Sequence, residues 1–180
     1  MKKSFIVYIG LIFSSYITFG QDSIPRYFEL TDTTFKVGDI HVFDSCYLNM
    51  GLTDVKDTIL IKATESIYKF MTTNTSVKIE IGAHVDYRGS LEYNDTLTDR
   101  RSKGIKDYLV AKGISESRIA TFGYGERKPR YITKKMHRLH RFLTTGNYLT
   151  EGFITKLDSD IDRQAACRLD RRIEIKILKK

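Results

Sequence analysis

Two kinds of hydrophobic periodicity alternate along the chain. Apolar side chains repeat at every second position in residues 35–43 and 77–85, which predicts two β-strands. In residues 57–71 they form one broad apolar side at helical spacing, which predicts an amphipathic helix. The alternation in the first strand changes phase at Gly38-Asp39, where we expect a β-bulge. The pattern therefore begins as β-α-β.

A second helix and two further strands follow. Ser90 is a suitable N-cap and Gly113 a suitable C-terminal stop, so a helix is predicted from Ser90 to Lys112. Residues 118–122 predict a short third strand, and residues 172–178 alternate isoleucine with charged residues as a fourth.

The order of these elements predicts the fold class. Gly123-Tyr124-Gly125 is expected to end the third strand, and residues 130–160 fit no clean period, so we interpret them as an insertion. Strands that alternate with helices predict an α+β fold in which the helices pack on one face of a small mixed sheet.

The first twenty residues have the layout of a secretory signal peptide. Lys2 and Lys3 precede a mostly apolar run at 5–19, and polar Gln21 follows small residues. The run is shorter than the ~20 residues of a membrane-spanning helix, although an uncleaved anchor is the alternative. We therefore expect residues 1–20 to be a signal peptide, 21–34 a short lead-in and 35–180 the folded domain.

Export changes how the cysteines and the charge are interpreted. Cys46 and Cys167 would meet an oxidising compartment, where one disulfide between them is possible and two buried thiols are the alternative. The whole chain carries a net charge of +8, and +6 remains without Lys2 and Lys3. Residues 127–142 alone carry +7, so the rest of the exported chain sums to −1. This concentration argues against nucleic acid as the partner and leaves one basic segment, whose default role is a solvated face.

An arginine on the apolar side of the second helix is the strongest indication of a site. Steps of three or four residues place Arg101 in line with Leu97 and Ile105. Asn94 lies one turn earlier, and Asp86 follows the second strand. Burying an unpaired charge is costly, so Arg101 and Asp86 form either an internal ion pair or a pocket for a zwitterionic amino acid.

The residues around this arginine resemble a known family. The run from Ile79 to Arg101, IEIGAHVDYRGSLEYNDTLTDRR, resembles the OmpA-like C-terminal domain of Gram-negative outer-membrane and peptidoglycan-associated proteins. The resemblance continues in YLVAKGISESRIATFGYGERKP and in LDRRIEI, so it covers roughly residues 35–129 and 161–178. It implies a β-α-β-α-β unit with a further helix and strand, which here would follow the insertion at 130–160.

The resemblance also implies a function. The family binds peptidoglycan non-covalently through the diaminopimelate of the stem peptide, which would tether or scaffold the protein at the cell envelope. It implies a periplasmic location at the cell wall or outer membrane, with envelope proteins as further partners. We expect no cofactor and no metal. The family's ligand-binding positions match Asp86, Arg101, Phe43, Asp44, Asn94, Leu97, Arg171 and Arg172.

Two alternatives remain open. An exported cell-wall hydrolase is the enzyme alternative, but the sequence has neither Gly-x-Ser-x-Gly nor His-Glu-x-x-His, so we predict a protein that is not an enzyme. The second alternative is binding of anionic lipid or an acidic partner through the basic insertion.

A metal site is not expected. His137 and His140 could share a helix face, but no further ligands complete such a site.

Overall fold

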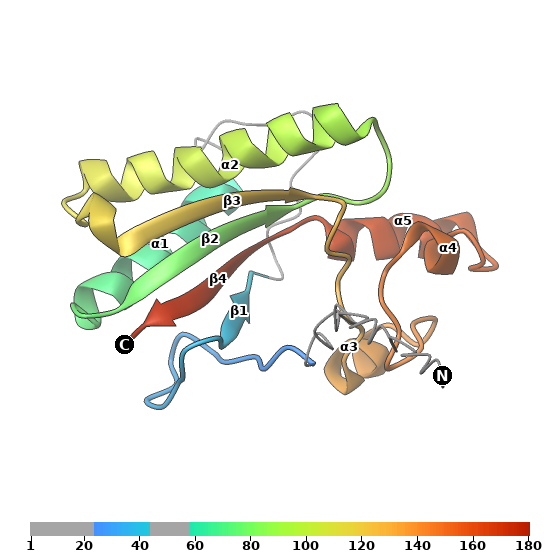
Figure 1. Ribbon diagram of the computed structural model, residues 1–180. Helices are drawn as coiled ribbons and strands as arrows, with labels where there is room; N and C mark the ends of the chain where they lie inside the picture. Colours follow the sequence, from blue (N-terminus) through green and yellow to red (C-terminus); the bar gives the residue numbers. More distant parts are fainter. Residues whose placement is uncertain (1–23, 44–57) are drawn as a thin grey trace, which may run out of the picture.

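The computed structural model describes residues 24–43 and 58–180. Its centre is a four-stranded mixed sheet in the order β1-β4-β2-β3 (Figure 1). The strands are β1 (Ile40–Val42), β2 (Lys78–His84), β3 (Ile119–Gly125) and β4 (Arg172–Lys179). β2 and β3 are parallel, whereas β4 runs antiparallel to both β1 and β2. The α+β fold and the mixed sheet expected from the sequence are confirmed.

Two long helices, α1 (Thr58–Thr73) and α2 (Leu91–Ala111), pack on one face of this sheet (Figure 1). Alternate residues of β2 and β4, such as Ile81 and Ile175, are buried against them in the main apolar core. The Ser90 side chain accepts a hydrogen bond from the Tyr93 amide and so caps α2. Gly113 just beyond the helix has a φ of +95°, a conformation that favours glycine.

The first and third strands differ from their predicted extents. Only Ile40–Val42 is a strand in the first segment, because the chain turns at Gly38, where φ is +91°. β3 does not end at residue 122 but continues to Gly125. Its glycines allow α2 to approach closely, since a Cβ atom at Gly123 would lie 2.5 Å from the Asp99 amide nitrogen.

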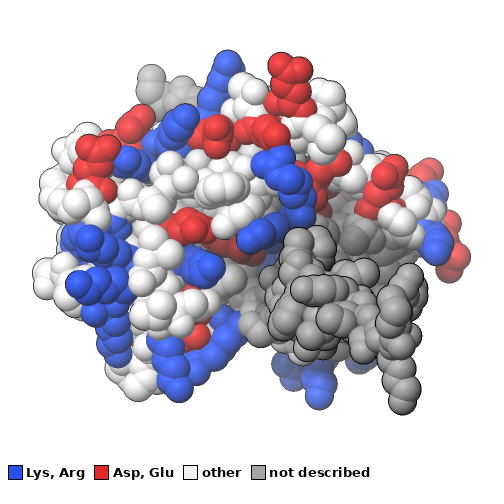
Figure 2. Space-filling model, in the orientation of Figure 1, with Lys and Arg blue, Asp and Glu red and all other residues white. Residues whose placement is uncertain are grey.

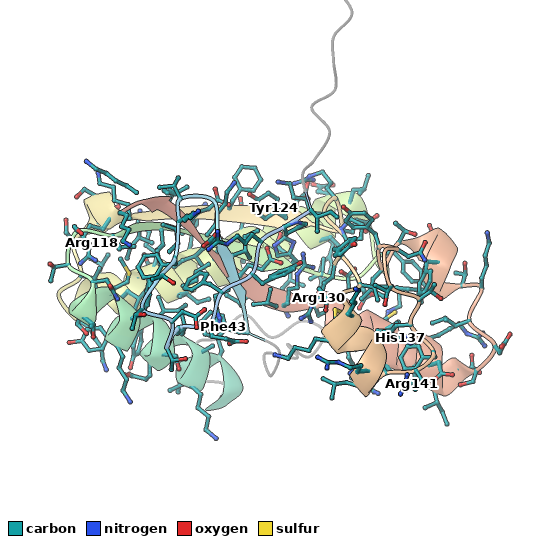
Figure 3. The ribbon with its side chains drawn as sticks, turned by 90° about the horizontal axis from the view of Figure 1, so that it is seen from below. Phe43, Arg118, Tyr124, Arg130, His137 and Arg141 are labelled. Carbon is teal, nitrogen blue, oxygen red and sulfur yellow. The ribbon has the colours of Figure 1, made fainter. Side chains whose placement is uncertain are left out.

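The segment between β3 and β4 is mostly irregular and contains three short helices. They are α3 (Lys134–Leu139), α4 (Glu151–Ile154) and α5 (Asp160–Asp170), and a 3₁₀ turn, η1 (Glu116–Arg118), precedes β3. Figure 3 shows Arg130, His137 and Arg141 at the end of the molecule far from Arg118. This segment encloses a second apolar cluster, made of Ile132, Met136, Leu143, Leu149, Ile154, Ala166, Cys167 and Leu169.

Several sequence predictions concern residues outside the described ranges. The signal peptide at 1–20, Asp44 and Cys46 are among them. Cys167 is buried, and burial raises the pKa of its thiol. The possible Cys46–Cys167 disulfide and the domain boundaries therefore stay predictions. Within residues 24–43 and 58–180, no helix has the length and apolar character needed to cross a membrane.

Candidate functional site

A cavity of about 310 Å³ lies where the C-terminal end of β2 meets the start of α2. A short loop joins β2 to α2, and antiparallel pairing places the start of β4 beside the end of β2, so residues distant in sequence share one cavity. Its lining residues are Val85, Asp86, Arg88, Gly89, Tyr93, Asn94, Leu97, Arg101 and Arg171.

The Asp86 carboxylate is the central acidic group of the cavity, and two arginines hold it. Arg88 donates from Nε to Oδ1 at 2.7 Å and from Nη2 to Oδ2 at 2.9 Å. Arg171 donates from Nη1 to Oδ2 at 2.6 Å. Burial by itself would raise the pKa of Asp86, but these charge-assisted hydrogen bonds outweigh it and hold the pKa below its ordinary value. Asp86 is therefore ionised at neutral pH.

The first half of α2 supplies the opposite wall. Asn94, Leu97 and Arg101 all face inward, and Arg101 has 0% of its surface exposed, which confirms its predicted place on the apolar side. The side-chain Nδ2 of Asn94 donates to Glu126 Oε2 at 2.7 Å and to the Arg88 carbonyl oxygen at 3.3 Å. These contacts fix the loop that carries Asp86 against the helix.

The structure brings together five of the eight predicted site residues. Asp86, Asn94, Leu97, Arg101 and Arg171 line the cavity.

The other three lie elsewhere or outside the described ranges. Phe43 lies at the end of β1, where its ring packs against the main core and edge-on to His41 at 4.6 Å (Figure 3). Arg172 does not line this cavity. It is buried on the opposite side of the sheet and donates to Glu174 and Asp170. Asp44 lies outside the described residues.

The sequence prediction omitted four lining residues, Val85, Arg88, Gly89 and Tyr93. Gly89 has a φ of +111°, and a Cβ atom there would lie 3.1 Å from Asn94 Oδ1. A glycine that directly follows an arginine in the loop after Asp86 was the available signal, because such a tight turn folds the arginine back toward the carboxylate.

Part of the chain matches a known protein family. Residues 55–138 match the model of the OmpA family, a range that contains β2, α2 and all of the lining residues except Arg171. The peptidoglycan-associated lipoprotein of Pasteurella multocida is 38% identical over 60 residues, which are 33% of this chain and 40% of that protein. The lipoprotein of the same name from Mesorhizobium japonicum is 32% identical over 98 residues, 54% of this chain and 55% of that protein. This chain thus matches about half the length of these relatives.

Solved structures show the same fold at low sequence identity. The peptidoglycan-associated lipoprotein from Burkholderia pseudomallei aligns with a TM-score of 0.50 and 18% identity, over 73% of this chain and 86% of that one. The periplasmic domain of Helicobacter pylori MotB aligns with a TM-score of 0.50 and 16% identity, over 80% and 78%. Residues 55–138 are thus similar in sequence to the OmpA family, and the described chain shares the fold of these two solved structures.

Proposed function

We propose that this protein binds peptidoglycan through the diaminopimelate of its stem peptide and so associates with the cell wall. The observation that carries the proposal is that Asp86, Arg101 and Arg171 line the same cavity. Two relatives named peptidoglycan-associated lipoprotein align over 60 and 98 residues, and residues 55–138 match the OmpA family. The corresponding location is the periplasm, at the cell wall or outer membrane.

The chemistry of the cavity suits a zwitterionic amino acid. The free end of diaminopimelate carries an ammonium and a carboxylate. A guanidinium such as that of Arg101 or Arg171 takes a carboxylate in a bidentate manner, and Asp86 accepts hydrogen bonds from the ammonium.

The ligand ammonium must replace one of the present donors to Asp86. The backbone amide of Arg88 also donates to Oδ1, so the four donors use the four acceptor positions of the carboxylate. The Arg88 side chain is 38% exposed and that of Arg171 11%. Arg88 is therefore the partner that moves aside, while Arg171 stays to orient the carboxylate.

Co-sedimentation with purified sacculi that contain diaminopimelate tests the proposal. Asp86→Asn removes the negative charge, and Arg101→Lys removes the planar guanidinium that can make two parallel hydrogen bonds to a carboxylate. Both keep the side-chain volume nearly unchanged, and each is expected to lower binding at least tenfold. Circular dichroism checks that each variant is folded. Arg138→Gln, an exposed charge removal in α3, is the matched control and should bind as the wild type does. Unchanged binding by both folded site variants would contradict the proposal.

The same sacculi address catalysis. We propose recognition without hydrolysis, because the charged groups of the cavity are engaged with one another and the matched relatives are named for association with peptidoglycan. Sacculi incubated with the protein should release no soluble fragments. Release of fragments would favour the hydrolase alternative.

Internal contacts occupy part of the basic segment 127–142. Arg127 pairs with Asp95 at 2.5 Å, Lys135 pairs with Glu29 at 3.4 Å, and Arg130 is buried. Fewer cations are thus available for an anionic surface than the sequence suggests. Binding to sacculi should accordingly depend weakly on salt between 0.05 and about 0.3 M, whereas a steep fall would favour the basic segment as the binding surface.

We also propose that residues 1–20 are removed on export and that residues 21–34 lead into the domain. Tyr27 forms a β-bridge with Ile40, which supports a lead-in that stays attached to the sheet. N-terminal sequencing of the protein recovered from the periplasm tests the cleavage position.

A further inference from the structure

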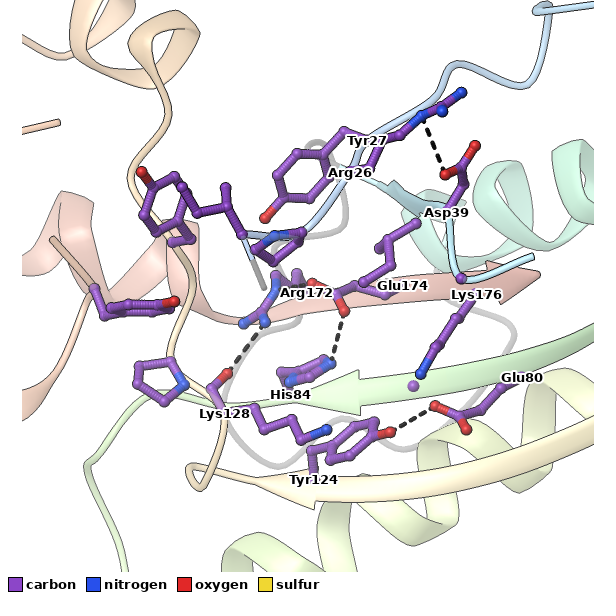
Figure 4. A pocket seen from close by; sticks show the side chains of 18 of the residues that line it. Arg26, Tyr27, Asp39, Glu80, His84, Tyr124, Lys128, Arg172, Glu174 and Lys176 are labelled. Atoms are coloured by element: carbon purple, nitrogen blue, oxygen red, sulfur yellow. Dashed lines mark hydrogen bonds and ion pairs between the residues drawn. The ribbon is translucent and has the colours of Figure 1, made fainter. Parts of the chain in front are cut away.

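A second, larger cavity of about 800 Å³ lies on the face of the sheet opposite α1 and α2 (Figure 4). Figure 3 shows Tyr124 on this side of the sheet, away from α1. Strands β2, β3 and β4 form its floor, and residues in 24–27, 36–40, 127–131 and 148–150 contribute to its walls. The cavity that contains Asp86 and Arg101, called the stem-peptide cavity below, shares no lining residue with this second cavity. The proposed function therefore does not account for the second cavity.

The floor of this cavity interleaves acidic and basic groups. Glu80 Oε1 accepts a hydrogen bond from the Tyr124 hydroxyl at 2.6 Å. Glu174 Oε1 accepts from Arg172 Nε at 2.6 Å, and Lys176 follows on the same face of β4. Figure 2 shows acidic and basic side chains next to one another near the middle of the view, with a run of basic side chains at the lower left. The floor therefore offers donors and acceptors side by side.

A buried histidine completes this floor. His84 is 1% exposed, and its ring stacks on Tyr124 with centroids 4.8 Å apart and planes at 14°. Nε2 lies 3.3 Å from Glu174 Oε2, and neither ring nitrogen has a well-aligned hydrogen bond to any residue in the described ranges. Since buried polar groups are normally hydrogen-bonded, this cavity floor has unused polar capacity.

Aromatic side chains form one wall of the cavity. The rings of Tyr131 and Tyr148 meet edge to face at 5.2 Å, and Tyr148 is 37% exposed. Tyr27 lines the cavity from the lead-in segment. Aromatic faces of this kind pack against the C–H groups on the face of a sugar ring.

These features restrict the class of ligand. A ligand of one charge sign would meet like charges on the floor, and an apolar ligand would bury the charges without partners. Hydroxyl and secondary amide groups both donate and accept, so they fit an interleaved floor. We infer that this cavity binds a neutral oligosaccharide, with its hydroxyl and acetamido groups on the charged floor and its ring faces on the tyrosine wall.

The two cavities lie back to back at the ends of β2 and β4. His84 and Arg172 line the oligosaccharide cavity. Asp86 and Arg171 line the stem-peptide cavity. The inference rests on the proposed function for the source of its ligand, because peptidoglycan joins stem peptides to a glycan strand of N-acetylated sugars. One domain could then hold both components of the wall.

Calorimetric titration of the full exported chain with two separate probes tests the inference. The probes are a β-1,4-linked tetramer of N-acetylglucosamine and a stem tripeptide that ends in diaminopimelate. Tyr148→Ala should weaken tetramer binding at least fivefold and leave tripeptide binding unchanged. Tyr93→Ala is the matched control, since it removes an exposed tyrosine from the stem-peptide cavity. It should leave tetramer binding unchanged.

The outcomes separate the two proposals. Absence of tetramer binding overturns the inference, whether or not the tripeptide binds. Equal loss of tetramer binding in both tyrosine variants, or no loss in Tyr148→Ala, overturns the assignment to this cavity. Tetramer binding without tripeptide binding supports the inference and contradicts the proposed function. If maltotetraose binds as tightly as the N-acetylglucosamine tetramer, the cavity binds saccharides in general. That result would overturn the glycan strand as its specific ligand.

Discussion

At the scale of single residues, neighbours in sequence serve opposite faces of the sheet. Arg171 donates to Asp86, whereas Arg172 donates to Glu174 and Asp170. Because successive side chains of an extended chain point to opposite sides, a two-residue Arg-Arg sequence supplies one guanidinium to each cavity. Substitutions of the two arginines should therefore have different effects.

The two arginines that hold Asp86 are expected to differ in their effect on ligand binding. Arg171→Gln removes a mostly buried donor that orients the carboxylate, so it should weaken stem-tripeptide binding at least tenfold. Arg88→Gln removes the more exposed donor, which the ligand ammonium replaces, and should weaken binding less than threefold. Calorimetric titration measures both. A loss in Arg88→Gln as large as that in Arg171→Gln would show that Arg88 stays in place and contacts the ligand.

His84 should make the stability of the protein depend on pH. Burial lowers its pKa from 6.5 to about 4, and the cations Arg172 and Lys128 add to this while Glu174 opposes it. The unfolded chain therefore binds a proton between these values that the folded chain does not. The stabilisation is fully present above pH 6.5 and is lost as the pH falls toward 4, by about 3 kcal/mol in total.

Urea unfolding at a series of pH values between 6.5 and 4.5 measures this effect. His84→Phe keeps a ring that can stack on Tyr124 and removes the titrating group. The difference in unfolding free energy between wild type and variant should therefore fall by about 2 kcal/mol from pH 6.5 to pH 4.5. Burial raises the pKa of Asp170 to about 7, which stabilises both proteins as the pH falls and cancels in this difference. The carboxylates Asp86 and Glu174 have pKa values below the ordinary range and titrate at lower pH. An unchanged slope in the variant would assign the pH dependence to other groups.

At the scale of elements, the close approach of α2 to β3 positions the stem-peptide cavity. The Gly123 amide donates to Asp99 Oδ1 at 3.1 Å, and the Gly125 amide donates to Thr98 Oγ1 at 3.1 Å. Side chains of α2 thus satisfy backbone groups of the edge strand. This approach holds the N-terminal half of α2, with Arg101, against the end of the sheet.

A methyl group at Gly123 should disrupt this approach. Its Cβ atom would lie 2.5 Å from the Asp99 amide nitrogen and 2.8 Å from Thr98 Oγ1, so α2 must shift. Gly123→Ala is expected to lower the free energy of unfolding by about 3 kcal/mol, which thermal and urea denaturation measure. Gly152→Ala in α4 is the control, because nothing lies within 4 Å of its Cβ position. Equal stability of the two variants would contradict the proposed role of Gly123.

These contacts explain which elements the sequence could predict. The local sequence pattern predicted both the start of α2 at Ser90 and the inner strands. The helix cap and the hydrophobic periods that indicate them lie within each segment. It misplaced the end of β3, because the glycines there serve a helix more than twenty residues earlier in the chain. The placement of Asp86 and Arg101 in one cavity followed from the family resemblance and helical spacing. The pairing of Arg88 with Asp86 depends on how the loop folds back, which a periodic pattern does not record.

At the scale of the whole molecule, the described part of the chain contains two apolar clusters. The main core lies between the sheet and the helices α1 and α2, and the second cluster is enclosed by residues 132–169. Polar contacts connect them: the Arg130 amide donates to Asp170 Oδ1 at 2.8 Å, and Arg172 donates to the same atom at 3.1 Å. Tyr87, in the loop after β2, also packs against the second cluster. Because most of the printed connecting contacts are polar, we expect the second cluster to open while the sheet stays folded.

Cys167 reports this local opening, because its thiol is buried in the second cluster. In a Cys46→Ser background, Leu143→Ala should speed the reaction of Cys167 with a thiol reagent at least tenfold, since it leaves a cavity in the same cluster. Amide hydrogen exchange of Ile79 and Ile175 in the main core should change little. Ile67→Ala is the matched control in α1, and it should speed exchange at those amides because it weakens the main core. Equal acceleration of both signals by both variants would show instead that the two clusters unfold as one cooperative unit.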